Sequence, residues 1–520
     1  MEYKKILKEI EPREYQINIS KKCLEKNTLV VLPTGLGKTL IALIVAIEKI
    51  QKEPLKKILF LAPTKPLAEQ HLNSFKEKLP NEWVEMDLFT GSVKKEKREK
   101  IWKEKSIIFS TPQCIANDLK NNLYSLKEVS LLIEDEAHRC VKNYDYSYIA
   151  KRYVKENSQG RTIGLTASPG NDKSNIKEIL KNLEIEEIEL RTRESPDVKP
   201  YLQELTFEKI EVELPKEFKE ISNNLNKLKE NLIEELRKNS GVFGNINKIT
   251  LINLQKKISS ELTRGYKSKE SYFALSQIAQ IIKIEHAIEL LETQTQKSFH
   301  KYMKELYLQA EKQKSRGVQK LVSKQEFNIA FSISHSLFKK GEEHPKIREI
   351  IKLVKKEKEK NENVKILIFT QYRETAKLVA EMVNNLFGIK SKVFVGQLKK
   401  EGIGLSQKEQ KEIINEFRKN ETNVLCATCI AEEGLDIPEV STVIFYEPVS
   451  SGIRTIQRKG RTARMSQGKL IMMITKDTKD ERAYYSSMQK EKSMKTQIEK
   501  VKEEIKKEKI FKENQKKLFT

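Results

Sequence analysis

The strongest constraint on the fold is a short glycine-rich segment that separates two apolar runs. Residues 29–32 predict a buried strand, residues 33–39 read PTGLGKT, and residues 40–50 predict an apolar helix. Glycines in such a loop let backbone N–H groups turn inward around phosphate oxygens, and the helix N-terminus adds its positive dipole end. Lys38 is expected to neutralise the β- and γ-phosphates of ATP, and Thr39 to bind Mg²⁺. The predicted ATP-contacting residues of the loop are Pro33, Thr34, Gly35, Leu36, Gly37, Lys38 and Thr39.

Alternating strand and helix patterns continue on both sides of a long middle segment. In the first part of the chain, further strands are predicted at residues 58–62, 107–110, 131–133 and 162–165. The pattern returns at residues 366–369, 392–395, 424–427, 443–445 and 469–473. Strands that alternate with helices predict right-handed crossovers and parallel sheets covered on both faces. The expected fold class is therefore α/β, with two RecA-like parallel-sheet domains.

The middle segment has a different character, because strand signals stop after residue 214 and helical periodicity follows. Leucines recur at helical spacing at positions 225, 228, 232 and 236, which predicts an inserted all-helical domain. The expected division is a RecA-like ATP-binding domain at residues 1–200, a thumb-like helical insertion at 201–345 and a second RecA-like domain at 346–490. The charged tail at 491–520 is expected to be an exposed helix that frays into disorder.

The charge balance indicates a polyanionic partner, while the cysteines and apolar runs exclude several other classes. The formal net charge is +24, which favours nucleic acid but also fits a lysine-rich solvated surface. Cys426 and Cys429 form a single CxxC without a second pair, so we expect core packing rather than zinc or redox chemistry. No stretch approaches the roughly 20 apolar residues of a membrane span. A reducing cytoplasm is expected, with nucleoid association in a prokaryotic cell.

An acidic segment follows the predicted strand at 131–133. A carboxylate at the C-terminal end of a parallel strand faces the crevice in which ligands bind. Asp135 is expected to hold Mg²⁺ through water, Glu136 to polarise the attacking water as general base, and His138 to couple the ATP state to the neighbouring domain. Acidic pairs after strands are also common as solvated loop caps, but the phosphate-binding loop favours the catalytic interpretation.

A basic segment in the second α/β region supplies the positive charge that phosphoryl transfer requires. Arg461 and Arg464 are three residues apart, so on a helix they would share one face. An arginine that reaches the γ-phosphate across a cleft is worth about 10³–10⁵ in rate. Gln457 and Arg458 are expected to join the same interface. Taken alone, this segment could equally be a basic helix that binds nucleic-acid phosphates.

The ordered set of motifs resembles the superfamily 2 helicases with a DEAH-type box. The matching segments are Arg13, Tyr15 and Gln16, then residues 62–67 with Gln70, 90–91, 110–113, 166–168, 369–373, 427–428 and 432–436. By this resemblance, Arg13 and Gln16 contact the adenine, and Gly434 and Asp436 the nucleotide. Thr166 and Ser168 link hydrolysis to movement. The implied nucleic-acid contacts are Thr64, Lys65, Thr111, Pro112, Thr370, Gln371 and Thr428.

Three longer segments are more specific, and they resemble the family of archaeal Hef helicases and Fanconi anaemia group M proteins. These segments are residues 395–414, 445–464 and 476–494. The resemblance implies ATP-dependent remodelling of forked or branched DNA during replication-fork repair, with an XPF-type nuclease or a sliding clamp as a family partner. The alternative is a double-stranded RNA-activated ATPase of the Dicer and RIG-I-like branch. A clamp that uses ATP only to switch affinity also stays open. An inactive scaffold is disfavoured, because all the expected catalytic residues are present: Lys38, Thr39, Asp135, Glu136, Arg461 and Arg464.

The helical insertion is expected to supply the preference for a nucleic-acid structure. Its aromatic residues Tyr266, Tyr272 and Phe273 could stack on bases, but core packing is the favoured expectation. Each basic residue there could equally belong to a solvated face. The residues that could grip a duplex are Lys256, Lys257, Arg264, Lys267, Lys297, Lys301, Lys304 and Arg316.

Overall fold

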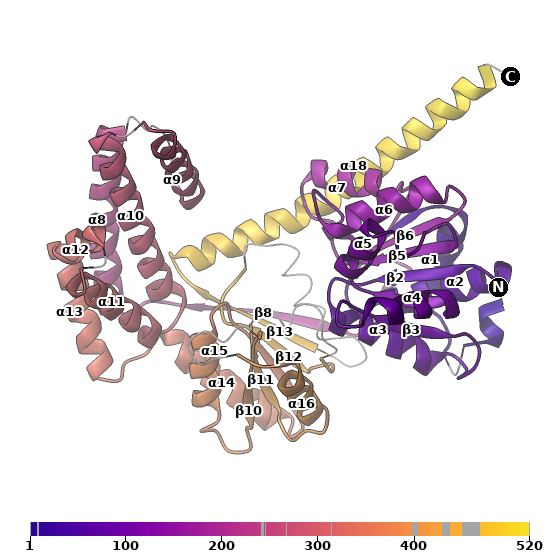
Figure 1. Cartoon of the computed structure of the whole chain (residues 1–520). Helices are drawn as coiled ribbons and strands as arrows, with labels where there is room; N and C mark the ends of the chain where they lie inside the picture. Colours follow the sequence, from indigo (N-terminus) through magenta and orange to yellow (C-terminus); the bar gives the residue numbers. More distant parts are fainter. Residues whose placement is uncertain are drawn as a thin grey trace.

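The chain forms two parallel-sheet domains, a helical bundle and a long C-terminal helix (Figure 1). A computed structural model describes residues 2–7, 10–240, 244, 246–266, 268–313, 315–397, 404–428, 437–449 and 468–518. Within those ranges, the helices are all too short or too polar to cross a membrane.

The first sheet is parallel throughout its described length. Its order is β3-β4-β2-β5-β6-β1-β7, so β5 is the central strand, with β2 and β6 on either side of it. The strands are β1 (Thr28–Val31), β2 (Lys57–Leu61), β3 (Met86–Phe89), β4 (Ile107–Ser110), β5 (Val129–Asp135), β6 (Arg161–Thr166) and β7 (Glu187–Leu190). The helices are α1 (Glu14–Glu25), α2 (Lys38–Lys52), α3 (Lys65–Lys78), α4 (Lys95–Glu104), α5 (Pro112–Lys120), α6 (Asp145–Glu156) and α7 (Lys173–Asn182).

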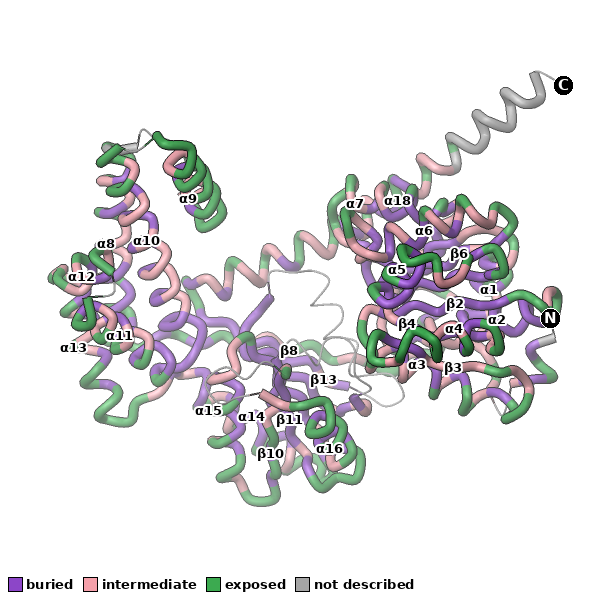
Figure 2. The backbone as a smooth tube through the Cα atoms, viewed as in Figure 1, coloured by how far each residue is buried: buried purple, intermediate pink, exposed green. Residues whose placement is uncertain are grey.

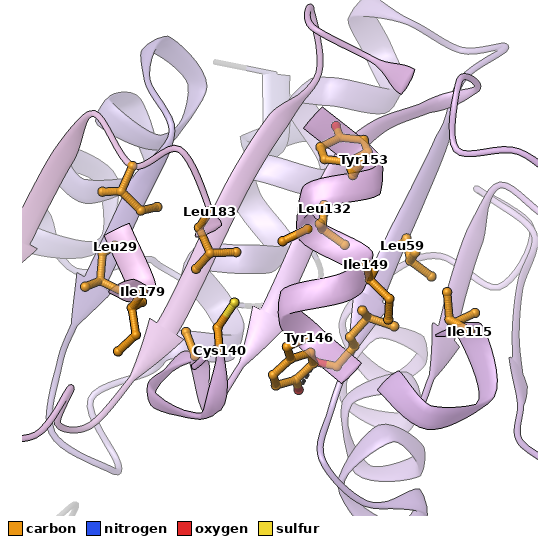
Figure 3. Packing of buried hydrophobic residues seen from close by; sticks show 14 of the residues in the cluster. Leu29, Leu59, Ile115, Leu132, Cys140, Tyr146, Ile149, Tyr153, Ile179 and Leu183 are labelled. Carbon is orange, nitrogen blue, oxygen red and sulfur yellow. Dashed lines mark hydrogen bonds between the residues drawn. The ribbon is translucent and has the colours of Figure 1, made fainter. Parts of the chain in front are cut away.

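Both faces of this sheet are covered, as the continuous apolar strands require. Leu29 and Val31 belong to one hydrophobic cluster, whereas Val30 and Leu32 belong to another on the opposite face, because successive strand side chains point to opposite sides. Figure 3 shows Leu29, Leu59 and Leu132 of the sheet packed beneath helix residues such as Ile149 and Ile179. The two packed faces hold the carboxyl ends of the strands in fixed positions.

The second sheet has the order β10-β11-β9-β12-β13-β8 and is also parallel. Its edge strand β8 comes from residues before the helical bundle and pairs with β13 from Leu205 opposite Gly468 to Val212 opposite Thr475. The strands are β8 (Leu205–Val212), β9 (Ile366–Phe369), β10 (Ser391–Phe394), β11 (Val424–Ala427), β12 (Thr442–Phe445) and β13 (Gly468–Thr475). The helices are α14 (Pro345–Lys360), α15 (Arg373–Val383) and α16 (Gln407–Arg418).

The position of β8 differs from the expectation that the helical insertion starts at residue 201. The chain first crosses to the second domain and adds a strand to its sheet, and the bundle begins only at α8 (Lys216–Ser240). The other helices of the bundle are α9 (Lys248–Thr263), α10 (Lys269–Thr293), α11 (Gln296–Glu311), α12 (Arg316–Val322) and α13 (Gln325–Lys339). The leucines at helical spacing in α8 lie in its core.

The aromatic residues at the tip of the bundle do not pack in its core. Tyr266, Tyr272 and Phe273 are 74%, 54% and 37% exposed, so the favoured expectation of core packing was wrong. They lie near the junction of α9 and α10, and α9 itself is largely exposed along one side (Figure 2). A two-helix tip offers too little neighbouring structure to cover large rings.

The C-terminal helix α18 (Lys479–Leu518) crosses from the second α/β domain to the first (Figure 1). At its base, the Asp480 carboxylate forms a fully buried ion pair with Lys346 of α14. Farther along, Met494, Ile498 and Val501 are buried in the core of the first domain. The segment that was expected to be an exposed tail therefore packs against the first domain through these three residues. They are spaced by four and three positions, so their apolar side chains form one stripe along the helix.

Candidate active site

The glycine-rich loop follows β1 and ends where α2 begins at Lys38. The Leu32 N–H donates to the Thr166 carbonyl of β6 at 3.0 Å, which ties the start of the loop to the sheet. Gly37 has a φ of +81°, and a Cβ there would lie 2.2 Å from the Gln16 side-chain nitrogen. The Thr34 hydroxyl is buried in the loop and has no hydrogen-bond partner among the described residues. The loop thus needs glycine and presents an unsatisfied polar group.

The residues expected to read the adenine lie directly beside this loop. The Tyr15 hydroxyl and the Gln16 amide both donate to the Leu36 carbonyl, at 2.8 and 3.1 Å. The Arg13 backbone N–H donates to the Gln16 side-chain oxygen at 2.9 Å, and its guanidinium lies 5.3 Å from the Tyr201 ring centre. These contacts brace the loop, and recognition of adenine by Arg13 and Gln16 stays a prediction.

The residues expected to bind Mg²⁺ converge around a histidine that the motif analysis did not select. The Thr39 hydroxyl lies 3.3 Å from His71 Nδ1, and the other ring nitrogen, Nε2, lies 2.8 Å from Asp135 Oδ2. The Lys38 ammonium donates to the Leu32 carbonyl at 2.9 Å at the same end of the loop. The structure therefore brings Lys38, Thr39 and Asp135 together, with His71 of α3 as a bridge.

The electrostatics of this cluster keep Asp135 in its charged form. Burial by itself raises the pKa of this carboxyl, but His71 and Lys38 outweigh burial and hold the pKa below its usual range. An ionised carboxylate, a hydroxyl and an ammonium at the end of a phosphate-binding loop fit a Mg²⁺–nucleotide, since Mg²⁺ prefers oxygen ligands. When bound, the metal would be held by Thr39 and Asp135 and would neutralise phosphate charge.

Glu136, the expected general base, sits in an unusual backbone conformation. Its φ of 52° lies in the left-handed region, which costs a non-glycine residue roughly 1–3 kcal/mol. The side chain is buried, and its Oε2 lies 3.2 Å from His138 Nδ1. Glu136 directly follows β5, whose seven residues are all buried, so the packed end of the strand holds this strained conformation beside Asp135.

The expected coupling residues form a connected chain of contacts from β5 to β6. His138 Nδ1 lies 3.3 Å from the Thr166 hydroxyl, which itself accepts from the Ser168 N–H at 3.1 Å. The Ser168 hydroxyl donates to the Met494 sulfur of α18 at 2.6 Å. The sequence motifs gave no sign of this last contact, which places the C-terminal helix against the coupling loop.

The expected nucleic-acid contacts divide into exposed and buried side chains. Thr64, Lys65 and Gln371 are exposed, and Thr111 is partly exposed, at the ends of strands or starts of helices. Pro112, Thr370 and Thr428 are buried, and the Thr370 hydroxyl donates to the Tyr372 carbonyl at 3.0 Å. The exposed side chains are accessible to a ligand, whereas the two buried threonines would need a local rearrangement, and all seven contacts stay predictions.

Six residues assigned to the second domain's share of the site lie outside the described residues. Cys429 of the CxxC also lies outside them, while Cys426 is fully buried in the second domain's core. The roles given to the six residues stay predictions. They are Gly434, Asp436, Gln457, Arg458, Arg461 and Arg464.

Three sequence families match consecutive parts of the chain. The DEAD/DEAH box helicase family matches residues 13–176, and the helicase conserved C-terminal domain matches residues 345–466. Between them, a helical bundle described for an ATP-dependent RNA helicase matches residues 216–338. The order of the three matches follows the order of the three folded parts.

Two curated relatives cover most of the chain. A Methanocaldococcus jannaschii protein, named as an ATP-dependent RNA helicase, is 39% identical over 94% of this chain and 61% of its own length. The mouse Fanconi anemia group M protein homolog is 30% identical over 93% of this chain and 25% of its own length. The chain therefore spans less than two thirds of these relatives.

A solved structure decides the family. The crystal structure of the Pyrococcus furiosus Hef helicase domain is 41% identical, with a TM-score of 0.71, over 92% of this chain and 98% of that one. The chain belongs to the Hef and Fanconi anaemia group M family of superfamily 2 helicases. It is an ATP-dependent helicase with two parallel-sheet domains and a helical bundle between them. The family resemblance and the fold class expected from the sequence are confirmed.

Proposed function

We propose that this Hef-family protein hydrolyses ATP to translocate along DNA and remodel forked or branched structures. The observation that carries the proposal is the cluster in which Lys38, Thr39 and Asp135 meet at the end of the glycine-rich loop. It occurs in a chain whose relatives include the mouse Fanconi anemia group M protein homolog and a fission yeast protein named as the ATP-dependent DNA helicase fml1. These relatives favour DNA over the double-stranded RNA alternative.

In the proposed reaction, each residue of the cluster has a separate task. Lys38 neutralises the terminal phosphates, Asp135 holds Mg²⁺ through its hydration shell, and Glu136 accepts the proton of the attacking water. Arg461 and Arg464 of the second domain stabilise the negative charge that develops on the γ-phosphate. Release of the cleaved phosphate after hydrolysis removes the charge that attracts these arginines, so that the domains part.

The movement of the two domains would be transmitted to a DNA strand by contacts on each domain. Thr64, Lys65, Thr111 and Gln371 would contact mainly phosphates, which position a strand but carry no sequence information. Because such binding releases counterions, the affinity should fall steeply with salt. A role in fork repair, a nucleoid location and a nuclease or clamp partner belong to the same proposal.

The test is the ATPase rate with forked DNA, single-stranded DNA, plain duplex and double-stranded RNA. We expect the greatest stimulation by forked DNA, with Lys38→Ala inactive on every substrate. A preference for double-stranded RNA would overturn the DNA assignment. Stimulation by DNA without strand displacement or branch migration would indicate a clamp, and no stimulation by any nucleic acid would refute the motor.

A further inference from the structure

We propose that His71 is a positioning residue that links the DNA-facing end of α3 to the Mg²⁺ ligands of the ATP site. The proposal rests on the proposed function, because the contact between α3 and DNA is itself part of that proposed function. His71 is 6% exposed and bridges two segments that are distant in sequence, with Thr39 at the start of α2 on one side and Asp135 at the end of β5 on the other. Both contacts join side chains and not backbone groups, so the bridge depends on the histidine side chain itself.

The two ring nitrogens have different tasks, which follow from their partners. A carboxylate only accepts hydrogen bonds, so His71 Nε2 donates its proton to Asp135 Oδ2 at 2.8 Å. In the neutral ring, where Nε2 carries the single proton, Nδ1 accepts the Thr39 hydroxyl proton at 3.3 Å. With its proton directed to His71, the Thr39 oxygen keeps its lone pairs for a metal ion. A single imidazole thus orients both oxygen ligands.

The ring is held in place by aromatic packing, so it does not rotate freely between partners. Its centre lies 4.5 Å from the ring centre of Phe60 on β2, and Phe75 of the same helix packs edge-on against Phe60 at 5.8 Å. Ala68, Leu72 and Phe75 are buried along the same face of α3. The helix, its aromatic contacts and the bridge therefore form one rigid unit.

That unit reaches the surface at the other end of the helix. Thr64 caps α3, Lys65 is its first residue, and both side chains are exposed. His71 lies seven residues after Thr64, about 10 Å along a helix that rises 1.5 Å per residue. A strand phosphate that shifts this helix end would shift the imidazole, and with it Thr39 and Asp135. The link would let DNA binding alter the geometry of the metal ligands.

Three substitutions separate the bridge from simple packing. His71→Phe keeps an aromatic ring against Phe60 but removes both hydrogen bonds. His71→Gln can still donate to Asp135 through its amide N–H, but its carbonyl oxygen does not lie where Nδ1 of the ring meets Thr39, so the contact with Thr39 is weakened. The matched control is His300→Phe, which removes another buried histidine, stacked on Phe331 and Phe338 in the helical bundle, far from the ATP site in the sequence.

The experiment measures the affinity of a fluorescent, non-hydrolysable ATP analogue with Mg²⁺ or EDTA, and with or without forked DNA. We expect the affinity of His71→Phe for the analogue to be about 10–100-fold lower than that of the wild type in Mg²⁺, which is the usual effect of removing a residue that supports metal ligands. In EDTA, the two proteins should bind the analogue equally well. In His71→Phe, the change in analogue affinity that forked DNA causes should also be smaller than in the wild type. His71→Gln should be intermediate in Mg²⁺-dependent affinity and in the DNA effect, and His300→Phe should match the wild type in both measurements.

Two results would overturn the proposal. If His71→Phe and His71→Gln both keep the wild-type Mg²⁺ dependence and the wild-type DNA effect, the histidine only packs against Phe60. If Mg²⁺ dependence falls but the DNA effect does not, the link along α3 does not exist. Failure of the proposed function is distinguishable, because it would appear in the wild-type protein as an ATPase that no nucleic acid stimulates.

Discussion

The docking of α18 on the first domain gives a quantitative prediction through Ile498→Asp. The Ile498 side chain is fully buried between Met494 and Val501 in the core of that domain. Burial of one such side chain contributes roughly 1.5–3 kcal/mol, and a carboxylate at the site adds a desolvation penalty. At about 1.4 kcal/mol per factor of ten, the equilibrium constant for docking should fall at least 10–100-fold.

The base of α18 should nevertheless stay folded, since it is held by the buried ion pair between Lys346 and Asp480. Hydrogen exchange followed by mass spectrometry is the assay. We expect peptides around residues 491–505 to lose protection, while those of β13 keep it. The matched control Lys500→Asp places the same carboxylate on the exposed side of the helix and should keep wild-type protection. Equal protection in Ile498→Asp, or equal loss in the control, would refute the docked helix.

Three further predictions follow from buried or strained groups. Lys346→Met leaves Asp480 buried without its cation, and should lower the free energy of unfolding by about 3–5 kcal/mol in urea titration; a loss below about 1 kcal/mol would contradict this. Burial raises the pKa of the Glu134 carboxyl well above its usual value in the folded protein. As the pH rises above the pKa that Glu134 has in the unfolded chain, the free energy of unfolding therefore falls, by about 1.4 kcal/mol per unit of pKa difference. Glu134→Gln should therefore raise Tm at pH 8 but not at pH 4, and equal Tm shifts at both would disprove the burial argument. Gly37→Ala should weaken ATP binding at least tenfold, since its Cβ meets Gln16 at a positive φ; unchanged binding would show that the loop adapts.

The central strands and the phosphate-binding loop could be predicted because their signals are local. Continuous apolar runs, such as that of β1 with its four buried residues, mark strands covered on both faces. The edge strands β3 and β7 were not predicted. Glu187 and Glu189 alternate with apolar residues in β7, which is half covered, so its run is too short and polar to stand out.

The residues missed by the sequence analysis depend on contacts that are distant in the chain. His71 touches residues 32 and 64 positions away, and a lone histidine in a helix gives no local sign of such partners. The Met494, Ile498 and Val501 stripe lies among many lysines and glutamates, which suggested a solvated tail. In the opposite direction, Tyr266 and Phe273 carry a core-like composition but lie at a tip with few neighbours.

The central claim is that hydrolysis at the glycine-rich loop drives the remodelling of forked DNA. The most direct measurement is strand separation on a fork with fluorophore-labelled arms, using wild-type protein and Glu136→Gln, each with ATP or a non-hydrolysable analogue. The account predicts separation only by the wild type with ATP, while Glu136→Gln still binds the fork and loses about 10²–10⁴-fold in rate. Separation of the arms at the wild-type rate by Glu136→Gln, or with the analogue, would contradict it.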